Sequence, residues 1–255
     1  MSSAAVLTST HEGVLTITIN RPEVRNAIDS AAAVGIAAAL DQLDQRDELL
    51  VGIVTGAGGT FSAGADLGAK LRGESPRVPG RGFAGIVQRS SPKPLIAAVE
   101  GYALAGGFEI ALACDIIVAA RGAKFGLPEV KRGLVATGGG LLTLAERIPY
   151  HVAMRLALTG DVIDASRAAD LGIVSDLTDD GAALEASLDI ARQIARNAPL
   201  SVRASKHIMV EARDWPKAEA FARQFEIADA IAHSYDAREG AAAFKEKREP
   251  RWTGR

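Results

Sequence analysis

The sequence has almost no cysteine, few aromatic residues and no long apolar run, and these scarcities exclude several classes of protein. Cys114 is the single cysteine among 255 residues, so a disulfide framework or a cysteine-rich zinc site within one chain is excluded. No segment approaches the ~18 uninterrupted apolar residues that a membrane-spanning helix needs. Residues 1–13 carry no lysine or arginine, so we expect no targeting segment, no membrane partner and a cytoplasmic location.

The chain also lacks an excess of positive charge. Its 29 basic and 31 acidic residues give a net charge of −2, so we expect no general affinity for nucleic acid. Hydrophobic residues make up 48% and charged residues 24% of the chain, a composition typical of globular proteins. The length fits one large domain or two small ones.

Short apolar runs alternate with glycine-rich turns in the first half of the chain. Such runs predict strands at residues 15–19, 49–54, 95–99 and 116–118, the first of them half-buried because apolar residues alternate with threonine. Helical spacing of apolar residues predicts helices at residues 182–197, 201–212, 216–232 and 237–247. The fold class is therefore an α/β core followed by a helical C-terminal third. Residues 70–91, rich in Gly, Pro, Ser and Arg, are interpreted as a loop over a pocket.

Several familiar catalytic motifs are absent or incomplete. Residues 55–59 resemble the glycine turn of a dinucleotide-binding fold, but no helix opens after them. None of the three tyrosines is followed four residues later by lysine, as a short-chain dehydrogenase requires. There is no nucleophile elbow around Ser62, no Walker loop and no His-Glu-x-x-His motif. The four histidines are scattered, so we predict no metal site.

Two glycine-rich segments, residues 61–67 and 101–109, favour a binding site. Gly106 and Gly107 precede an apolar helix, so free N–H groups and the positive end of the helix dipole can bind an anion. Glu109 follows Gly106 by three residues and therefore lies on the same side of the helix. The alternative is tight packing at the glycines and a solvated charge at Glu109.

A second acid supports the functional interpretation. Glu129 follows Pro128, which can begin a helical turn and direct the carboxylate from its start. Taken alone, a residue such as Glu129 is more often a solvated acid in the first turn of a helix.

These residues, in this order, resemble the enoyl-CoA hydratase/isomerase (crotonase) superfamily. The resemblance rests on Asn20-Arg21-Pro22 with Asn26-Ala27, and on residues 61–67, 101–115, 125–129 and 244–248. Each motif is weak alone, but the ordered set covers nearly the whole chain and is specific. The Gly-Gly-Phe-Glu and Leu-Pro-Glu segments are most similar to the hydratase and carnitinyl-CoA dehydratase branch.

The resemblance implies a fold, an assembly and a substrate. The fold is a spiral of ββα units over residues 1–195, which would hold the acyl-CoA site, and a helical oligomerisation region over residues 196–255. Such chains form homotrimers, often paired into hexamers. The partner is an acyl-CoA thioester, and no separate cofactor is needed because CoA is part of the substrate.

The resemblance also implies roles for individual residues. Backbone N–H groups of Ala65 and Gly106 would form an oxyanion hole for the thioester carbonyl. Glu109 would activate water and Glu129 would protonate the α-carbon. The expected substrate and CoA contacts are Arg25, Ala27, Ala63, Asp66, Leu67, Thr137, Phe244 and Lys247, the last two sometimes reaching the site of a neighbouring subunit.

Two positions depart from the usual family pattern. Gly68 stands where many relatives carry a lysine, which removes one contact to CoA. Thr137 stands near the expected water site, where relatives have glycine, so its hydroxyl would hold water or its bulk would alter substrate choice.

The resulting prediction is an enoyl-CoA hydratase that adds water reversibly and syn to a 2-enoyl-CoA in fatty-acid or related acyl-CoA metabolism. The alternatives are another reaction of the same fold, namely a carnitinyl-CoA-type dehydratase, an enoyl-CoA isomerase or a thioesterase, and a catalytically silent acyl-CoA-binding protein.

Overall fold

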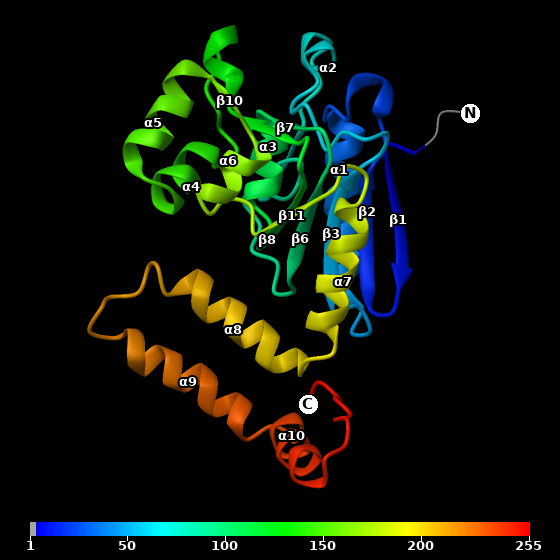
Figure 1. The fold of residues 1–255 in the computed structure, drawn as a ribbon, viewed down its shortest axis with the longest axis vertical. Coiled ribbons are helices and arrows are strands. Elements are labelled where there is room, and N and C mark those ends of the chain that lie inside the picture. The colour runs from blue at the N-terminus through cyan, green and yellow to red at the C-terminus, as the bar shows by residue number, and fades with distance from the viewer. Residues whose placement is uncertain (1–3) are drawn as a thin grey trace.

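The computed structural model describes residues 4–255, which form an α/β core and a helical C-terminal arm, residues 196–255 (Figure 1). A six-stranded sheet in the order β1-β2-β3-β6-β8-β11 lies at the centre of the core. β1 (Val6–His11) and β2 (Val14–Ile19) are antiparallel, whereas β3 (Val51–Gly56), β6 (Leu95–Val99), β8 (Ile116–Ala120) and β11 (Asp176–Thr178) continue the sheet in parallel. The predicted strands correspond to β2, β3, β6 and β8, and the α/β fold class is confirmed.

Helices cover both faces of this sheet. α1 (Ser30–Gln45) packs on one face, and the Asp29 carboxylate caps its start by accepting a hydrogen bond from Ala32 N–H at 2.8 Å. α7 (Ala183–Ala195) packs on the other face against β3, β6 and β8. Alternate strand residues therefore enter two separate apolar clusters. β2 is buried on both faces, so the half-buried strand predicted from its threonines is wrong.

A second, three-stranded sheet in the order β10-β9-β7 positions the carboxylates of interest. β6 leads into β7 (Tyr102–Leu104) and α3 (Gly106–Leu112), and β8 leads into β9 (Lys124–Gly126) and the 3-10 helix η2 (Pro128–Arg132). β7 and β9 are parallel, with Leu104 opposite Gly126. The two short helices therefore begin side by side, and these repeats are the expected ββα units. β10 (Val162–Asp164) completes the sheet.

The loop predicted at residues 70–91 contains local structure. α2 (Leu67–Leu71) leads into it, and a hairpin of β4 (Arg77–Val78) and β5 (Gly82–Phe83) lies within it. A short 3-10 helix, η1 (Pro22–Val24), lies before α1. The hairpin places Arg77 opposite Phe83, and both line the cavity described below.

The C-terminal third of the chain is mostly helical, as predicted, and further helices precede it. α4 (Gly140–Arg147), α5 (Tyr150–Thr159) and α6 (Ala165–Asp170) belong to the core, and α8 (Pro199–Glu211), α9 (Ala220–Ala232) and α10 (Tyr235–Glu246) form the C-terminal arm. α9 begins later than predicted because residues 216–219 form a turn, in which Glu219 N–H donates to Pro216 O at 2.8 Å. Within residues 4–255, no helix is long and apolar enough to cross a membrane.

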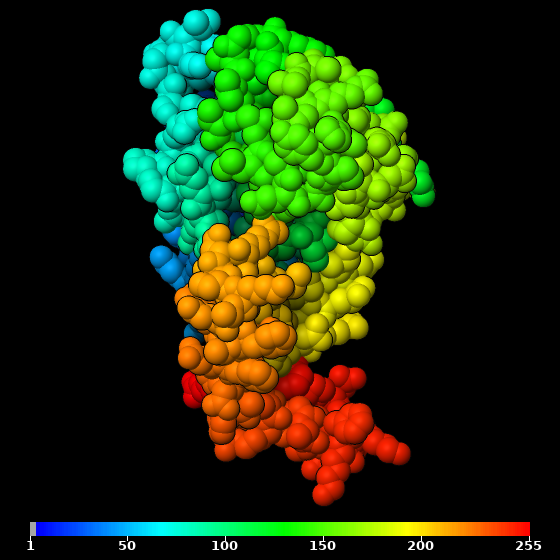
Figure 2. Space-filling view, turned by 90° about the vertical axis from the view of Figure 1, so that its left-hand side faces the viewer, coloured from blue at the N-terminus to red at the C-terminus, as the bar shows by residue number. Residues whose placement is uncertain are grey.

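The arm extends away from the core (Figures 1 and 2). α8 and α9 pack against each other. Polar contacts tie the arm to the core: Lys206 Nζ lies 2.6 Å from Asp115 Oδ2 and donates to Lys93 O at 2.9 Å, and Arg213 Nη1 lies 3.3 Å from Glu146 Oε2. Large apolar side chains of the arm remain exposed, including Phe221, Phe225 and Phe244.

Candidate active site

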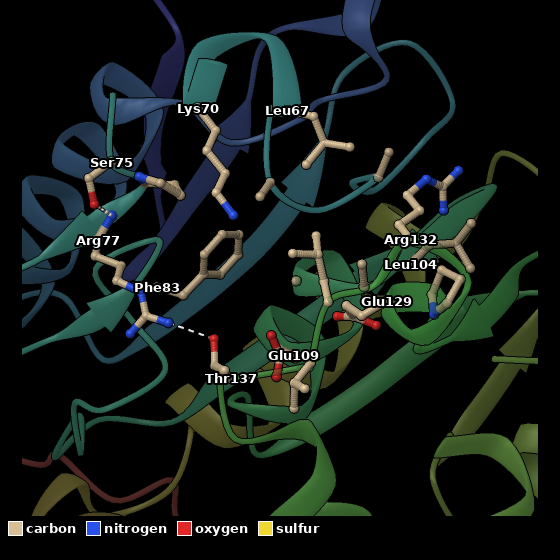
Figure 3. Close-up of a pocket in the computed structure, with 18 of the residues that line it drawn as sticks. Leu67, Lys70, Ser75, Arg77, Phe83, Leu104, Glu109, Glu129, Arg132 and Thr137 are labelled. Atoms are coloured by element: carbon tan, nitrogen blue, oxygen red, sulfur yellow. Dashed lines mark hydrogen bonds between the residues drawn. The ribbon is translucent and has the colours of Figure 1, made fainter. Parts of the chain in front are cut away.

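A cavity of about 450 Å³ opens where α3, η2 and the loop of residues 70–91 meet (Figure 3). The predicted site residues that line it are Arg25, Ala63, Ala65, Leu67, Gly106, Glu109, Glu129 and Thr137. The fold thus brings together both acids, both predicted oxyanion donors and several predicted CoA contacts.

Gly106 begins α3 and presents an unused backbone donor to the cavity. The N–H groups of Phe108 and Glu109 donate to Ala105 O at 2.9 Å and 3.1 Å, whereas the first N–H of a helix has no partner within it. Ala105 adopts a positive φ of 52° to begin this turn. A Cβ on Gly106 would collide with the ring of Phe83. Glycine at position 106 therefore allows the ring of Phe83 to lie close to the start of α3.

Ala65 supplies a second backbone N–H, which points away from Ile28, the residue with which Ala65 forms a β-bridge. Ile28 pairs with Ala65 by donating to Gly64 O at 2.7 Å and accepting from Asp66 N–H at 3.0 Å. In a parallel bridge of this kind, the N–H between the two bonded groups points to the opposite side. Gly64 has a φ of 93°, and a Cβ on it would lie 2.9 Å from the Gly106 nitrogen. The two segments therefore approach each other closely.

Glu109 is nearly buried, with 4% of its surface exposed. Its Oε1 accepts hydrogen bonds from Gly138 N–H at 2.6 Å and Gly140 N–H at 3.0 Å. Burial raises the pKa of Glu109, although the two N–H donors and the charge of Arg77 oppose that rise. The carboxylate is thus held by backbone donors and keeps a proton more readily than an exposed glutamate does.

Glu129 lies in the first turn of η2, directly after Pro128, as predicted. Its Oε2 is one of two buried side-chain oxygen or nitrogen atoms within residues 4–255 that have no hydrogen-bond partner. Burial, and next the negative charge of Glu109, raise the pKa of Glu129. An unpaired buried carboxyl oxygen beside a second carboxylate is costly for stability, and proton transfer is a function that explains its retention.

Thr137 lies next to the backbone that binds Glu109. Its Oγ1 accepts a hydrogen bond from Arg77 Nη2 at 2.5 Å (Figure 3). The hydroxyl predicted to hold water is therefore engaged by an arginine, which fixes both side chains at the cavity wall.

Four other predicted site residues lie outside the cavity lining. Ala27 is buried, and its carbonyl accepts from Arg21. Asp66 caps α2 by accepting from Ala69 N–H at 3.0 Å and is paired with Arg21. Phe244 and Lys247 lie at the end of α10, where the chain in Figure 1 is far from α2 and β7. Their predicted contacts with CoA remain predictions.

The structure also adds cavity residues that sequence reasoning did not name. Lys70, Arg77 and Phe83 lie on the loop of residues 70–91, and Arg132 lies at the end of η2. The loop itself was the only sequence signal for the first three. No group of three or more His, Cys, Asp or Glu side chains in the described part of the chain is arranged to hold a metal ion.

Comparison with known proteins gives consistent matches. The profile of the enoyl-CoA hydratase/isomerase family matches residues 9–255. A curated carnitinyl-CoA dehydratase from Citrobacter koseri is 39% identical over 254 residues, covering 96% of this chain and 97% of that protein.

Solved structures extend these matches. An enoyl-CoA hydratase from Mycobacterium tuberculosis H37Rv superposes with a TM-score of 0.97 at 55% identity, over 99% of this chain and 100% of that one. A carnitinyl-CoA hydratase from Mycobacterium avium superposes with a TM-score of 0.80 at 41% identity, over the full length of both chains.

Proposed function

Because this chain belongs to the enoyl-CoA hydratase/isomerase family, we propose that it adds water reversibly across the double bond of a 2-enoyl-CoA thioester. The observation that carries this proposal is the pair of buried carboxyl groups, Glu109 and Glu129, beside two unused backbone donors in one cavity. The reaction needs no cofactor beyond the CoA of the substrate. A cytoplasmic location remains a prediction from the sequence.

The backbone donors supply electrostatic stabilisation. Adding water at the β-carbon moves negative charge onto the thioester oxygen. The N–H groups of Ala65 and Gly106 would bind this oxygen, and the positive end of α3 adds to their effect. A fixed donor of this kind contributes roughly 3–4 kcal/mol at the transition state.

The carboxyl groups move the protons. The water oxygen forms its bond to the β-carbon while one of its protons passes to Glu109. The α-carbon takes a proton from Glu129, and a proton transfer between the two acids and solvent restores the starting state. This scheme needs one ionised and one protonated carboxyl group. The raised pKa values of Glu109 and Glu129 favour the sharing of one proton between the two groups.

A second candidate is the elimination of water from a carnitinyl-CoA, since curated relatives at 39% identity carry that name. The same residues serve both directions of the reaction, so the two candidates differ in the acyl group. A silent acyl-CoA binder has no need for two buried acids, and the site therefore disfavours it.

We propose that Arg25, Ala63 and Leu67 contact the CoA moiety at the mouth of the cavity, with Ala27 and Asp66 supporting the same segments. Residues 1–195 would form the catalytic core, and residues 196–255 would pack in a homotrimer or a hexamer. Phe244 is 87% exposed, so we propose that its ring packs against a neighbouring subunit. Phe244 and Lys247 would then complete the nucleotide site of that neighbour.

The test is the rate of crotonyl-CoA hydration by the wild type, Glu129→Gln and Glu185→Gln, with the affinity for crotonyl-CoA measured alongside. We expect Glu129→Gln to lose turnover while affinity changes little, because glutamine keeps the shape but cannot donate the proton. Glu185→Gln is the control, since Glu185 pairs with Arg192 on the surface of α7. Lost affinity with unchanged turnover per bound substrate would contradict the proposed role.

A further inference from the structure

Two exposed cations without carboxylate ion pairs, Lys70 and Arg77, line the cavity. Figure 3 shows the Lys70 ammonium beside the ring of Phe83 and the Arg77 guanidinium directed to the Thr137 hydroxyl. In the described part of the chain, neither side chain has a carboxylate within ion-pair distance, and the Arg77 guanidinium donates a hydrogen bond to the Thr137 hydroxyl. This arrangement is unusual for a pocket that would bind only an alkyl chain.

The other arginines of the same loop differ from Arg77. Each is paired with a carboxylate: Arg72 with Glu74, Arg81 with Asp41 and Arg89 with Asp44. Glu74, which also lines the cavity, is therefore engaged by Arg72 and in addition accepts from Ser30 Oγ at 3.0 Å. Arg77 alone among them lines the cavity without a carboxylate ion pair, although its charge also acts on Glu109.

The direction of the substrate places Arg77 at the acyl end. This step rests on the proposed function: the α-carbon lies at Glu129 and the β-carbon at Glu109, so the acyl chain continues past Glu109. In Figure 3, Arg77 and Thr137 lie on one side of Glu109, and Glu129 and Arg132 lie on the other. The acyl chain therefore runs toward Arg77, while CoA leaves on the opposite side.

We propose that this site prefers an acyl-CoA whose acyl chain ends in a carboxylate, with Arg77 as the residue that binds it. One Nη group is oriented by Thr137, and the remaining N–H groups of the planar guanidinium are suited to a carboxylate. Lys70 adds a second positive charge beside the same space. Phe83 packs against the methylene groups that join the carboxylate to the double bond.

The same charges disfavour an acyl group that carries a fixed positive charge, as a carnitinyl group does. A quaternary ammonium group is usually held by aromatic rings and negative charge. Here it would meet Lys70, Arg77 and a single aromatic ring, that of Phe83. This preference therefore predicts that the chain acts on a different substrate from that of the carnitinyl-CoA dehydratases to which it is similar.

The test compares two unreactive esters of equal length, adipyl-CoA and hexanoyl-CoA, by calorimetric titration. We expect the wild type to bind adipyl-CoA about tenfold or more tightly, because a hydrogen bond to a charged group changes affinity by roughly that factor. In Arg77→Gln the ratio should fall to about one. Arg155→Gln, which removes an exposed arginine outside the cavity lining, should keep the wild-type ratio. An equal affinity of the wild type for both esters, or a ratio unchanged in Arg77→Gln, would overturn the inference.

Turnover of 2-hexenedioyl-CoA and 2-hexenoyl-CoA separates this inference from the proposed function. A preference for adipyl-CoA without turnover of either enoyl ester would support the carboxylate site and refute the hydratase. Hydration of 2-hexenoyl-CoA without a preference for adipyl-CoA would support the hydratase and refute the carboxylate site.

Discussion

The backbone that holds Glu109 leaves no room for a side chain, and Gly138→Ala tests how strictly its position matters. A Cβ at Gly138 would lie 2.5 Å from Glu109 Oε2 and 2.8 Å from its Cδ. To restore an ordinary contact of 3.4 Å, the carboxylate must move by about 0.9 Å. Gly138 has no positive φ, so alanine fits the backbone and the effect falls on the carboxylate.

We expect Gly138→Ala to lower kcat for crotonyl-CoA by about a hundredfold, since a displacement of ~1 Å in a catalytic group has roughly this cost. The assay is the loss of enoyl-thioester absorbance under saturating substrate. The control is a double-mutant cycle with Glu109→Gln. Because Gly138→Ala acts through Glu109, it should add little to the defect of Glu109→Gln.

A kcat within about threefold of the wild type would refute this reasoning, since Glu109 would then tolerate the displacement. A defect in Gly138→Ala that adds fully to that of Glu109→Gln would also refute it, because the glycine would then act independently of the carboxylate.

Two further predictions concern stability. The folded state raises the pKa of Glu129 above its usual value of 4.5, so the stability that protonated Glu129 contributes is present below pH 4.5 and is lost as pH rises through the folded pKa. Glu129→Gln should therefore raise Tm relative to the wild type more at pH 7 than at pH 4 in a calorimetric scan. An equal difference in Tm at both pH values would contradict this prediction. Lys93 is 1% exposed and donates to Leu43 O at 2.7 Å and to Arg46 O at 2.8 Å at the end of α1. Lys93→Met should lower the free energy of unfolding by about 2–4 kcal/mol, measured by urea titration. A change below about 1 kcal/mol would show that these two hydrogen bonds contribute little to stability.

The sequence allowed prediction of those parts of the site that depend on local structure. Gly106 and Glu109 belong to one helix start, and Pro128 sets the turn that carries Glu129. In both cases the spacing along the chain determines which side of a short helix a group occupies. That these two helices begin side by side depends on the pairing of β7 with β9.

Contacts between distant segments escaped sequence reasoning. Arg77 meets Thr137 from 60 positions away, and its loop has no periodicity that predicts which side chain enters the cavity. The N–H groups of Gly138 and Gly140 bind a carboxylate on another helix. β2 was predicted as half-buried because nothing in its own residues indicates that α7 covers its second face.

The central claim is that two acids in one cavity deliver water and a proton to one double bond. Hydration of crotonyl-CoA in D₂O, followed by absorbance and by NMR of the product, tests it most directly. The account predicts loss of the enoyl-thioester absorbance and one deuterium on the α-carbon, on the same face as the new hydroxyl group. Unchanged absorbance, or deuterium on the opposite face, would contradict it.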